Sequence, residues 1–334
     1  MKLSVDGMSD LNLAEDAGSS VYIPILDLED TSVMQKDAER AVLLREACSN
    51  HGFFAVKGTS QFFPFDLVKE HQRVQEAFFN LPEETKKEIS VNECQCGYSR
   101  FGEETLDPEG STVGDCREGL YFRRSTVREH PLQGKNQWPR EDEVPGYRKI
   151  VEEYMERVTA LGFYLVELIS LSLGFERSFL NQFFQDPMIT LRPLKYQAVA
   201  SNEERGQFAC GKHSDYGFLT ILYAPMPGLQ ILKGSTWIDV KPLSDGFVVN
   251  IGDMLEHWTG GFMKSTVHRV INPSGRERFS CPLFFEPDFH ACVQPLPGYD
   301  HRKGSCDHNF HEKITSGEYL MRKYAETHAD FSTV

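Results

Sequence analysis

Two histidines and an aspartate have the residue types and the spacing of a metal site. The stretch 212–217 contains His213 and Asp215 and comes directly before the apolar run 218–223, so we expect the pair at a strand end or in the adjoining turn. Side chains two residues apart in an extended chain share a face, and both can point at one ion. His268 adds a second histidine on a later expected strand. The three residues match the two-histidine, one-carboxylate facial triad of non-haem iron, which leaves coordination positions open for reactants.

The His-x-Asp spacing alone is weakly specific, because the chain contains it twice. His328 and Asp330 repeat it in the C-terminal tail. At the end of an expected helix a two-residue offset turns side chains apart, and no histidine follows, so we interpret this pair as a chance match. Cys94 and Cys96 lack a second cysteine pair at zinc-finger spacing, and we interpret them as part of a loop.

An arginine and a hydroxyl follow the strand expected to carry His268. Arg278 and Ser280 alternate onto one face of the expected strand 276–281 and offer a guanidinium fork and a hydroxyl to a carboxylate. Taken alone, an arginine here is slightly better explained as a surface residue of an edge strand. Together with the candidate metal ligands, we interpret it as an anchor for an anionic co-substrate.

The elements that must position these residues begin with a helical region that contains minor strands. We expect strands at 22–28 and 53–56 and helices at 33–50 and 64–80, with another short helix starting near 81. The segment 92–137 is rich in Gly, Glu, Arg and Ser and has little periodicity, so we expect loops there. Its aromatic residues are candidates to line a site: Tyr98, Tyr121 and Phe122.

The character of the chain then changes. A long amphipathic helix is expected at about 144–173, in a position to support a sheet. From 189 to about 289, short runs rich in β-branched and aromatic residues are separated by turn residues, which is typical of an antiparallel sandwich or barrel. A last helix is expected at 316–328. We divide the chain into a flexible leader (1–20), an N-terminal helical and strand region (21–140), a support helix with the catalytic core (141–290) and a C-terminal extension (291–334).

The composition indicates a globular protein. The 334 residues, 40% of them apolar, can bury a full core, and nothing approaches the roughly 18 consecutive apolar residues of a membrane span. Because an apolar signal-like run is missing and the cysteines are scattered, we expect a cytoplasmic protein with reduced thiols. We expect it to be a monomer or a weak homo-oligomer. A formal net charge of −14 repels phosphate groups, so we expect a small-molecule substrate rather than nucleic acid or a membrane as partner.

The order of these motifs resembles that of the isopenicillin N synthase-like family of Fe(II)/2-oxoglutarate-dependent dioxygenases, from about Tyr22 to the last helix. The matching stretches are 23–28, His51-Gly52-Phe53-Phe54, 78–82, His213-Ser214-Asp215-Tyr216-Gly217, 265–270, Arg278-Phe279-Ser280 and Phe284-Phe285-Glu286-Pro287. The resemblance implies a mainly β fold with flanking helices. Its core would be a double-stranded β-helix, or jelly roll, with a helical N-terminal region, a C-terminal helix and the triad at its open mouth.

The resemblance also implies the cofactors. Fe(II) on His213, Asp215 and His268 would use O2 to decarboxylate 2-oxoglutarate to succinate and CO2 and to oxidise an unactivated C–H bond, with ascorbate as a compatible reductant. The strand 191–196 matches the family strand whose tyrosine helps to hold the far carboxylate of 2-oxoglutarate, which assigns that role to Tyr196. Many plant members have Asn two residues before this tyrosine, where this chain has Leu194.

Strand alternation predicts the substrate pocket. If Tyr196 faces inward, so do Leu194 and Arg192, and even steps from Ser280 bring Phe284 to the same side. The candidate substrate residues are Arg192, Leu194, Tyr216 and Phe284, together with Arg117 and Tyr121 from the segment that often closes over the pocket in the family. We expect a small polar, carboxylate-bearing substrate that Arg192 clamps. An ion pair of Arg192 with a nearby acid is the equally weighted alternative.

Three other interpretations fit the same residues. Hydroxylation is the default outcome, but the same iron chemistry could instead close a ring or desaturate the substrate. An oxidase that uses no 2-oxoglutarate would employ Arg278 and Ser280 to hold another anion. An inactive jelly-roll ligand-binding protein would keep the fold without turnover.

Overall fold

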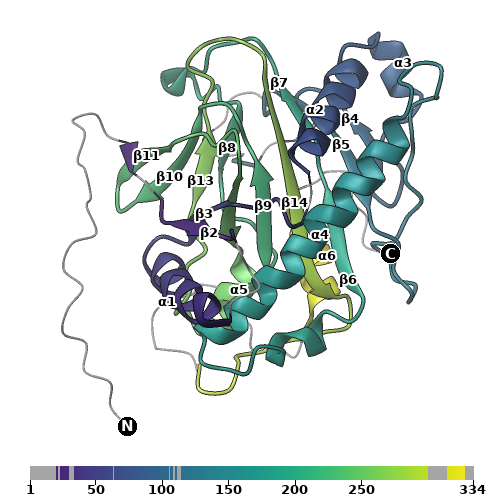
Figure 1. Ribbon diagram of the computed structural model, residues 1–334. Coiled ribbons are helices and arrows are strands. Elements are labelled where there is room, and N and C mark those ends of the chain that lie inside the picture. The colour runs from purple at the N-terminus through teal and green to yellow at the C-terminus, as the bar shows by residue number, and fades with distance from the viewer. Residues whose placement is uncertain are drawn as a thin grey trace.

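Two β-sheets face each other in the computed structural model (Figure 1), which describes residues 20–21, 23–29, 34–62, 64–104, 106–107, 110, 114–299 and 314–327. The major sheet has the order β2 (Ile25–Asp27), β3 (Phe53–Lys57), β12 (Phe247–Ile251), β9 (Leu219–Tyr223), β14 (Arg278–Asp288), β6 (Pro187–Leu191), β5 (Arg117–Arg123) and β4 (Gly97–Ser99), with β7 (Leu194–Tyr196) pairing with β14 and β5. The minor sheet has the order β1 (Ser20–Val21), β11 (Thr236–Val240), β10 (Leu229–Lys233), β13 (His268–Val270) and β8 (Cys210–His213). Nearly all pairs are antiparallel, as a jelly roll requires.

Helices cover one face of the major sheet. They are α1 (Met34–Asn50), α2 (Phe65–Phe79), α3 (Glu83–Lys87), α4 (Tyr147–Ser172) and α5 (Asp253–Trp258). The last helix, α6 (Ser316–Thr327), follows a small pair, β15 (Cys292–Val293) and β16 (Ile314–Thr315), and its Leu320 and Tyr324 reach the interior side of the sheet. The helix α4 runs diagonally across this sheet (Figure 1). The helices expected at 33–50, 64–80, 144–173 and 316–328 are thus confirmed, with ends that differ by a few residues. Leader residues 1–19 and the His328/Asp330 pair lie outside the described residues.

The core is divided between the two faces of the major sheet by strand alternation. Odd-numbered residues of β9 and β14, such as Ile221 and Phe285, pack with α4 in the larger apolar cluster. Even-numbered residues point between the sheets, where Val248 and Leu194 join a second cluster. The polar even-numbered residues Thr220, Asn250 and Ser280 therefore face the interior of the jelly roll rather than the helices.

A glycine allows α4 to approach the sheet closely. A Cβ placed on Gly162 would lie 2.3 Å from the ring of Phe285, which is fully buried on β14. Only hydrogen fits there, because packed cores leave no room for an added methyl group.

The expectation of loops throughout 92–137 is wrong for two stretches, β4 and β5. The strand β5 is buried along its whole length and pairs with β4, β6 and β7. Its charged residues resemble surface residues in the sequence, so the apolar pattern does not reveal the strand. Inside the fold these charges are neutralised: the Nζ of Lys86 lies 2.6 Å from Glu118. Tyr98 and Phe122 consequently do not line the site. The Tyr98 hydroxyl bonds Glu118, and the Phe122 ring stacks on Trp138 at 4.5 Å.

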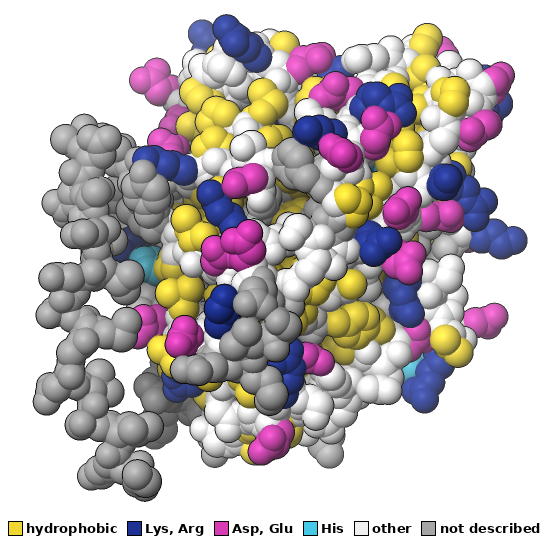
Figure 2. Space-filling model, viewed as in Figure 1, with side chains coloured by type: hydrophobic (Ala, Val, Ile, Leu, Met, Phe, Trp, Pro, Cys, Tyr) yellow, Lys and Arg dark blue, Asp and Glu magenta, His cyan; other side chains and the backbone are white. Residues whose placement is uncertain are grey.

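The surface carries both signs of charge. On the face shown in Figure 2, acidic and basic side chains are interspersed rather than gathered by sign. Among the described helices, none combines the length and the apolar character that crossing a membrane requires.

Candidate active site

The three candidate metal ligands converge at one end of the cavity between the sheets. His213 is the last residue of β8, Asp215 lies in the turn before β9, and His268 begins β13 directly opposite His213 in the sheet register. One ligand atom from each residue lies within 4.8 Å of the others. The Nε2 atoms of both histidines lie 3.7 Å from Oδ1 of Asp215. The side chains therefore present two nitrogens and one oxygen to a common point, as a facial metal site needs.

Backbone carbonyls orient both imidazole rings. Nδ1 of His213 lies 2.9 Å from the carbonyl oxygen of Gly211, and Nδ1 of His268 lies 3.1 Å from that of Thr266. Because a carbonyl only accepts, each Nδ1 is the protonated nitrogen, and each Nε2 keeps its lone pair for a metal.

Two neutral donors fix the carboxylate of Asp215. Thr220 Oγ1 and Asn250 Nδ2 donate to its Oδ2 over 2.5 and 2.6 Å. Both donors come from even-numbered positions of β9 and β12 that face the interior. They leave Oδ1 turned toward the histidines, so this carboxylate is set up to give one oxygen to a metal.

The pKa values favour the protonation states that bind a metal. Burial lowers the pKa of His213, and burial together with the neighbouring His213 lowers the pKa of His268 to about 4. Burial opposes ionisation of Asp215, but the histidines and the hydrogen bonds from Asn250 and Thr220 outweigh it and lower the pKa of this carboxyl. Near neutral pH the site therefore holds two neutral imidazoles and one carboxylate.

The same cavity contains a buried arginine whose Nη atoms lack hydrogen-bond partners. Arg278 is 2% exposed, and its Nη1 and Nη2 atoms are buried without a hydrogen-bond partner, while its Nε donates to the carbonyl of Pro227 over 3.0 Å. Its guanidinium stacks 4.7 Å from the ring centre of Tyr196, whose hydroxyl lies 3.2 Å from Ser280 Oγ. Two orphaned donors beside two hydroxyls fit the far carboxylate of 2-oxoglutarate, since a buried charge requires a partner.

All the residues predicted to contact substrate line this cavity. They are Arg117, Tyr121, Arg192, Leu194, Tyr216 and Phe284. Arg192, however, is ion-paired with Glu104, which is the alternative that the sequence left open. The cavity wall is completed by Leu320 and Tyr324 of α6, so the C-terminal helix contributes to the site.

Sequence reasoning missed the side chains that support the candidate ligands. Thr220 and Asn250 could have been found as single polar residues inside otherwise apolar strand runs, at positions that alternate toward the interior. Glu104 has no such signal, because it lies in the irregular part of 92–137 and meets Arg192 across 88 residues.

Comparisons with known proteins agree with this geometry. Residues 23–141 match the model of the N-terminal region of non-haem dioxygenases in morphine synthesis, and residues 185–287 match the 2OG-Fe(II) oxygenase superfamily. The 2-oxoglutarate-dependent dioxygenase traH of Penicillium crustosum is 36% identical over 91% of this chain and 92% of its own length. The 2-oxoglutarate-dependent dioxygenase caaD of Aspergillus niger is 33% identical over 83% of this chain and 88% of its own length.

The same family appears among solved structures. A full-length Neurospora crassa protein, crystallised with alpha-KG (2-oxoglutarate), superposes with a TM-score of 0.79 at 27% identity, covering 93% of this chain and 98% of that one. A chain with these relatives, a jelly-roll core and a His-Asp-His cluster uses Fe(II), 2-oxoglutarate and O2. The protein thus belongs to the 2OG-Fe(II) oxygenase superfamily and is a non-haem Fe(II)/2-oxoglutarate-dependent dioxygenase.

Proposed function

We propose that His213, Asp215 and His268 hold Fe(II), that Arg278, Ser280 and Tyr196 hold the far carboxylate of 2-oxoglutarate, and that the enzyme hydroxylates a C–H bond of a small polar metabolite. The observation that carries this proposal is the buried Arg278 guanidinium, whose two Nη atoms lack partners in the cavity that also contains the three ligands. When bound, iron and 2-oxoglutarate supply the oxidising power.

The residues of this chain bind, orient and shield the reactants. Thr220 and Asn250 hold Asp215 so that one carboxylate oxygen faces the ligand site. Arg278 and Ser280 fix the depth at which a dicarboxylate sits, because a fork of two N–H donors accepts a carboxylate in one orientation. Aromatic and apolar side chains on the substrate side, Tyr216, Phe284 and Leu320, exclude water from the place where a substrate C–H bond would lie.

Substrate identity must come from this pocket rather than from relatives. The Neurospora crassa protein has also been crystallised with thymine, whereas a soybean relative of 32% identity is named homoarginine-6-hydroxylase. The expectation of a substrate carboxylate rests on Arg192, and this arginine is already ion-paired with Glu104. A small polar substrate is therefore the part of the expectation that we carry forward.

Succinate release tests the proposal. The protein loaded anaerobically with Fe(II) should, on admission of O2, convert 2-oxoglutarate to succinate slowly alone and faster with its substrate, whose product gains 16 mass units. A product lighter by 2 mass units would replace hydroxylation with ring closure or desaturation. Substrate oxidation without any succinate would contradict the proposal and favour the 2-oxoglutarate-independent oxidase.

A further inference from the structure

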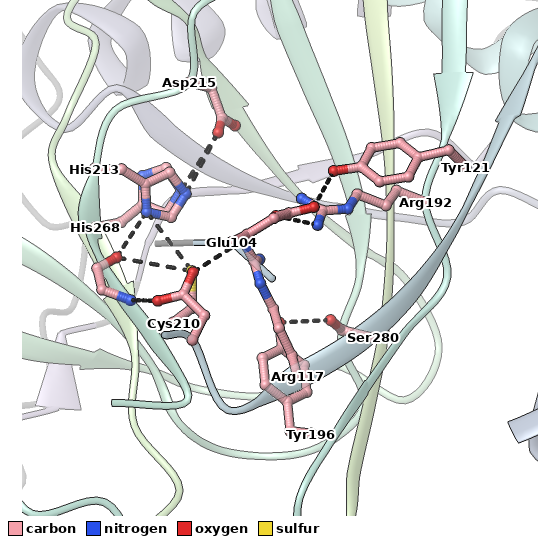
Figure 3. Close-up of polar contacts among 12 residues, drawn as sticks. Glu104, Arg117, Tyr121, Arg192, Tyr196, Cys210, His213, Asp215, His268 and Ser280 are labelled. Carbon is pink, nitrogen blue, oxygen red and sulfur yellow. Dashed lines mark hydrogen bonds and ion pairs between the residues drawn. The ribbon is translucent and has the colours of Figure 1, made fainter. Parts of the chain in front are cut away.

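The substrate side of the cavity has a polar wall made of four buried side chains: Glu104, Arg117, Tyr121 and Arg192. Figure 3 shows the Glu104 carboxylate pointing at the Arg192 guanidinium and the Tyr121 hydroxyl. Arg117 Nη2 lies 3.1 Å from the same carboxylate, and the Arg192 guanidinium also stacks 4.4 Å from the ring centre of Tyr121. Glu104 is therefore the shared acceptor of the wall.

A second carboxylate completes the charge balance. Asp115 Oδ2 lies 3.1 Å from Arg117 Nη2, and Asp115 Oδ1 accepts a hydrogen bond from the Gly211 amide over 3.0 Å. The amide of Asp115 donates to the carbonyl of Glu104 over 2.8 Å, which fixes the backbone of Glu104 against the start of β5. Two guanidinium groups thus face two carboxylates, and the wall and Asp115 together have no formal net charge.

Arg278 has the features of an arginine that awaits an anion, and the other arginines of this cavity can be compared with it. Both of its Nη atoms are buried and lack a partner, whereas Arg117 and Arg192 each use an Nη atom on a carboxylate of the chain. Among the described residues that line the cavity, these three are the arginines, and no lysine joins them. A substrate carboxylate would consequently have to displace Glu104 or remain in a buried site without a counter-charge, and both are costly.

An uncharged polar group fits the wall better. Nε of Arg117 and Nε of Arg192 are buried donors without a partner, and a neutral carbonyl oxygen can accept from a guanidinium without disturbing either ion pair. The opposite surfaces are aromatic or apolar, from Tyr216, Phe284 and Leu320. Such a cavity suits a flat or compact molecule with amide-like polar edges.

We propose that Glu104 is a specificity-determining residue: together with Asp115 it neutralises Arg117 and Arg192, and it thereby makes the enzyme select an uncharged amide-type substrate over the corresponding carboxylate. This inference rests on the proposed function, because it concerns which molecules enter the same site. Arg192 is then part of a charge-balanced wall rather than a clamp for a substrate carboxylate.

Matched amide and carboxylate pairs test the selection on the wild-type enzyme. The probes are benzamide and benzoate, cyclohexanecarboxamide and cyclohexanecarboxylate, and indole-3-acetamide and indole-3-acetate. Binding is measured as the ligand-induced rise in melting temperature of the enzyme loaded anaerobically with Fe(II) and 2-oxoglutarate, and stimulation as succinate release in air. The amides should bind more tightly and stimulate more. A preference for the carboxylates, or no response to any of the six, would overturn the inference.

The variant Glu104→Gln keeps the shape of the side chain and removes its charge. The variant leaves one guanidinium charge without a counter-charge, so its melting temperature should fall. The ratio of amide affinity to carboxylate affinity should shift by about tenfold or more toward the carboxylates, and a bound carboxylate should restore the melting temperature. The control Glu103→Gln alters the exposed neighbour, which pairs with Arg100, and should leave the ratio unchanged. A merely structural Glu104 would lower the melting temperature of the variant without creating a response to carboxylates, and that result would also overturn the inference.

Substrate selection and the iron chemistry can fail separately. If the wild-type enzyme releases succinate from 2-oxoglutarate but prefers carboxylates, only the role of Glu104 is wrong. If it releases no succinate under any condition, the proposed function itself is wrong.

Discussion

At the scale of single residues, Arg278 is a buried cation whose Nη1 and Nη2 atoms have no hydrogen-bond partner in the described part of the chain. The variant Arg278→Gln should raise the Kd for 2-oxoglutarate by roughly 30-fold or more, because truncating one member of a buried charge pair costs about 2–5 kcal/mol. Fluorescence or calorimetric titration of 2-oxoglutarate against the Fe(II)-loaded protein measures it. The exposed Arg276→Gln on the same stretch is the matched control. Equal affinities of the two variants would mean that 2-oxoglutarate binds elsewhere.

A second residue-scale prediction concerns the hydrogen bond from Thr220 to Asp215. Replacing Thr220 with Val keeps the shape but removes the donor to Oδ2, so the carboxylate can rotate away from the ligand site. Fe(II) affinity should fall by roughly 10- to 100-fold, as is usual when groups that orient a metal ligand are lost. Competition with a metal-binding dye reads this out. The exposed Thr236→Val should bind Fe(II) like wild type, and a Thr220→Val variant that did the same would show that Asn250 alone suffices.

At the scale of elements, the contact of α4 with β14 depends on Gly162. The variant Gly162→Ala should lower the free energy of unfolding by about 1–3 kcal/mol, because its methyl group would overlap Phe285 in a packed core. Urea unfolding followed by circular dichroism measures the loss. The control Ala160→Leu adds more atoms on the exposed side of the same helix and should change stability little. A gain in stability of Gly162→Ala, from the higher helix propensity of alanine, would show that α4 does not approach β14 this closely.

Elements with regular periodicity could be predicted from the sequence, and elements stabilised by buried charge could not. The apolar spacing of α4 and the alternation of β14 indicate which faces are buried, and the same alternation puts Arg278 and Ser280 on one face. The strand β5 was missed because Arg117 and Glu118 resemble surface residues until Asp115 and Lys86 are seen beside them. Glu104 was missed for the same reason, since its partners are distant in sequence. Residue roles taken from the family order, and the division of the chain at 20, 140 and 290, stay predictions.

At the scale of the whole molecule, buried histidines make stability depend on pH. His71 stacks on Tyr154 at 3.8 Å, and burial lowers its pKa to about 3. An unfolded histidine has a pKa near 6.5, so between about pH 6.5 and 3 unfolding takes up a proton at this residue and the folded state loses stability as the pH falls. Above about pH 6.5 the contribution is constant.

The variant His71→Gln should therefore make the pH dependence shallower. Between pH 6 and 5 the metal-free wild type should lose about 1.2 kcal/mol more than the variant, which lacks this titrating group. Urea unfolding of both proteins at these two pH values gives the difference. Identical slopes would show that the imidazole is accessible to protons in the folded state.

The central claim is that one cavity holds Fe(II) on His213, Asp215 and His268 beside 2-oxoglutarate on Arg278. Its most direct test is to add Fe(II) and then 2-oxoglutarate to the protein under anaerobic conditions and to record the visible spectrum. We predict a metal-to-ligand charge-transfer band in the wild type and in the exposed-histidine control His290→Ala, and no band in His213→Ala or His268→Ala. Absence of the band from the wild type, or its persistence in the two ligand variants, would contradict the claim.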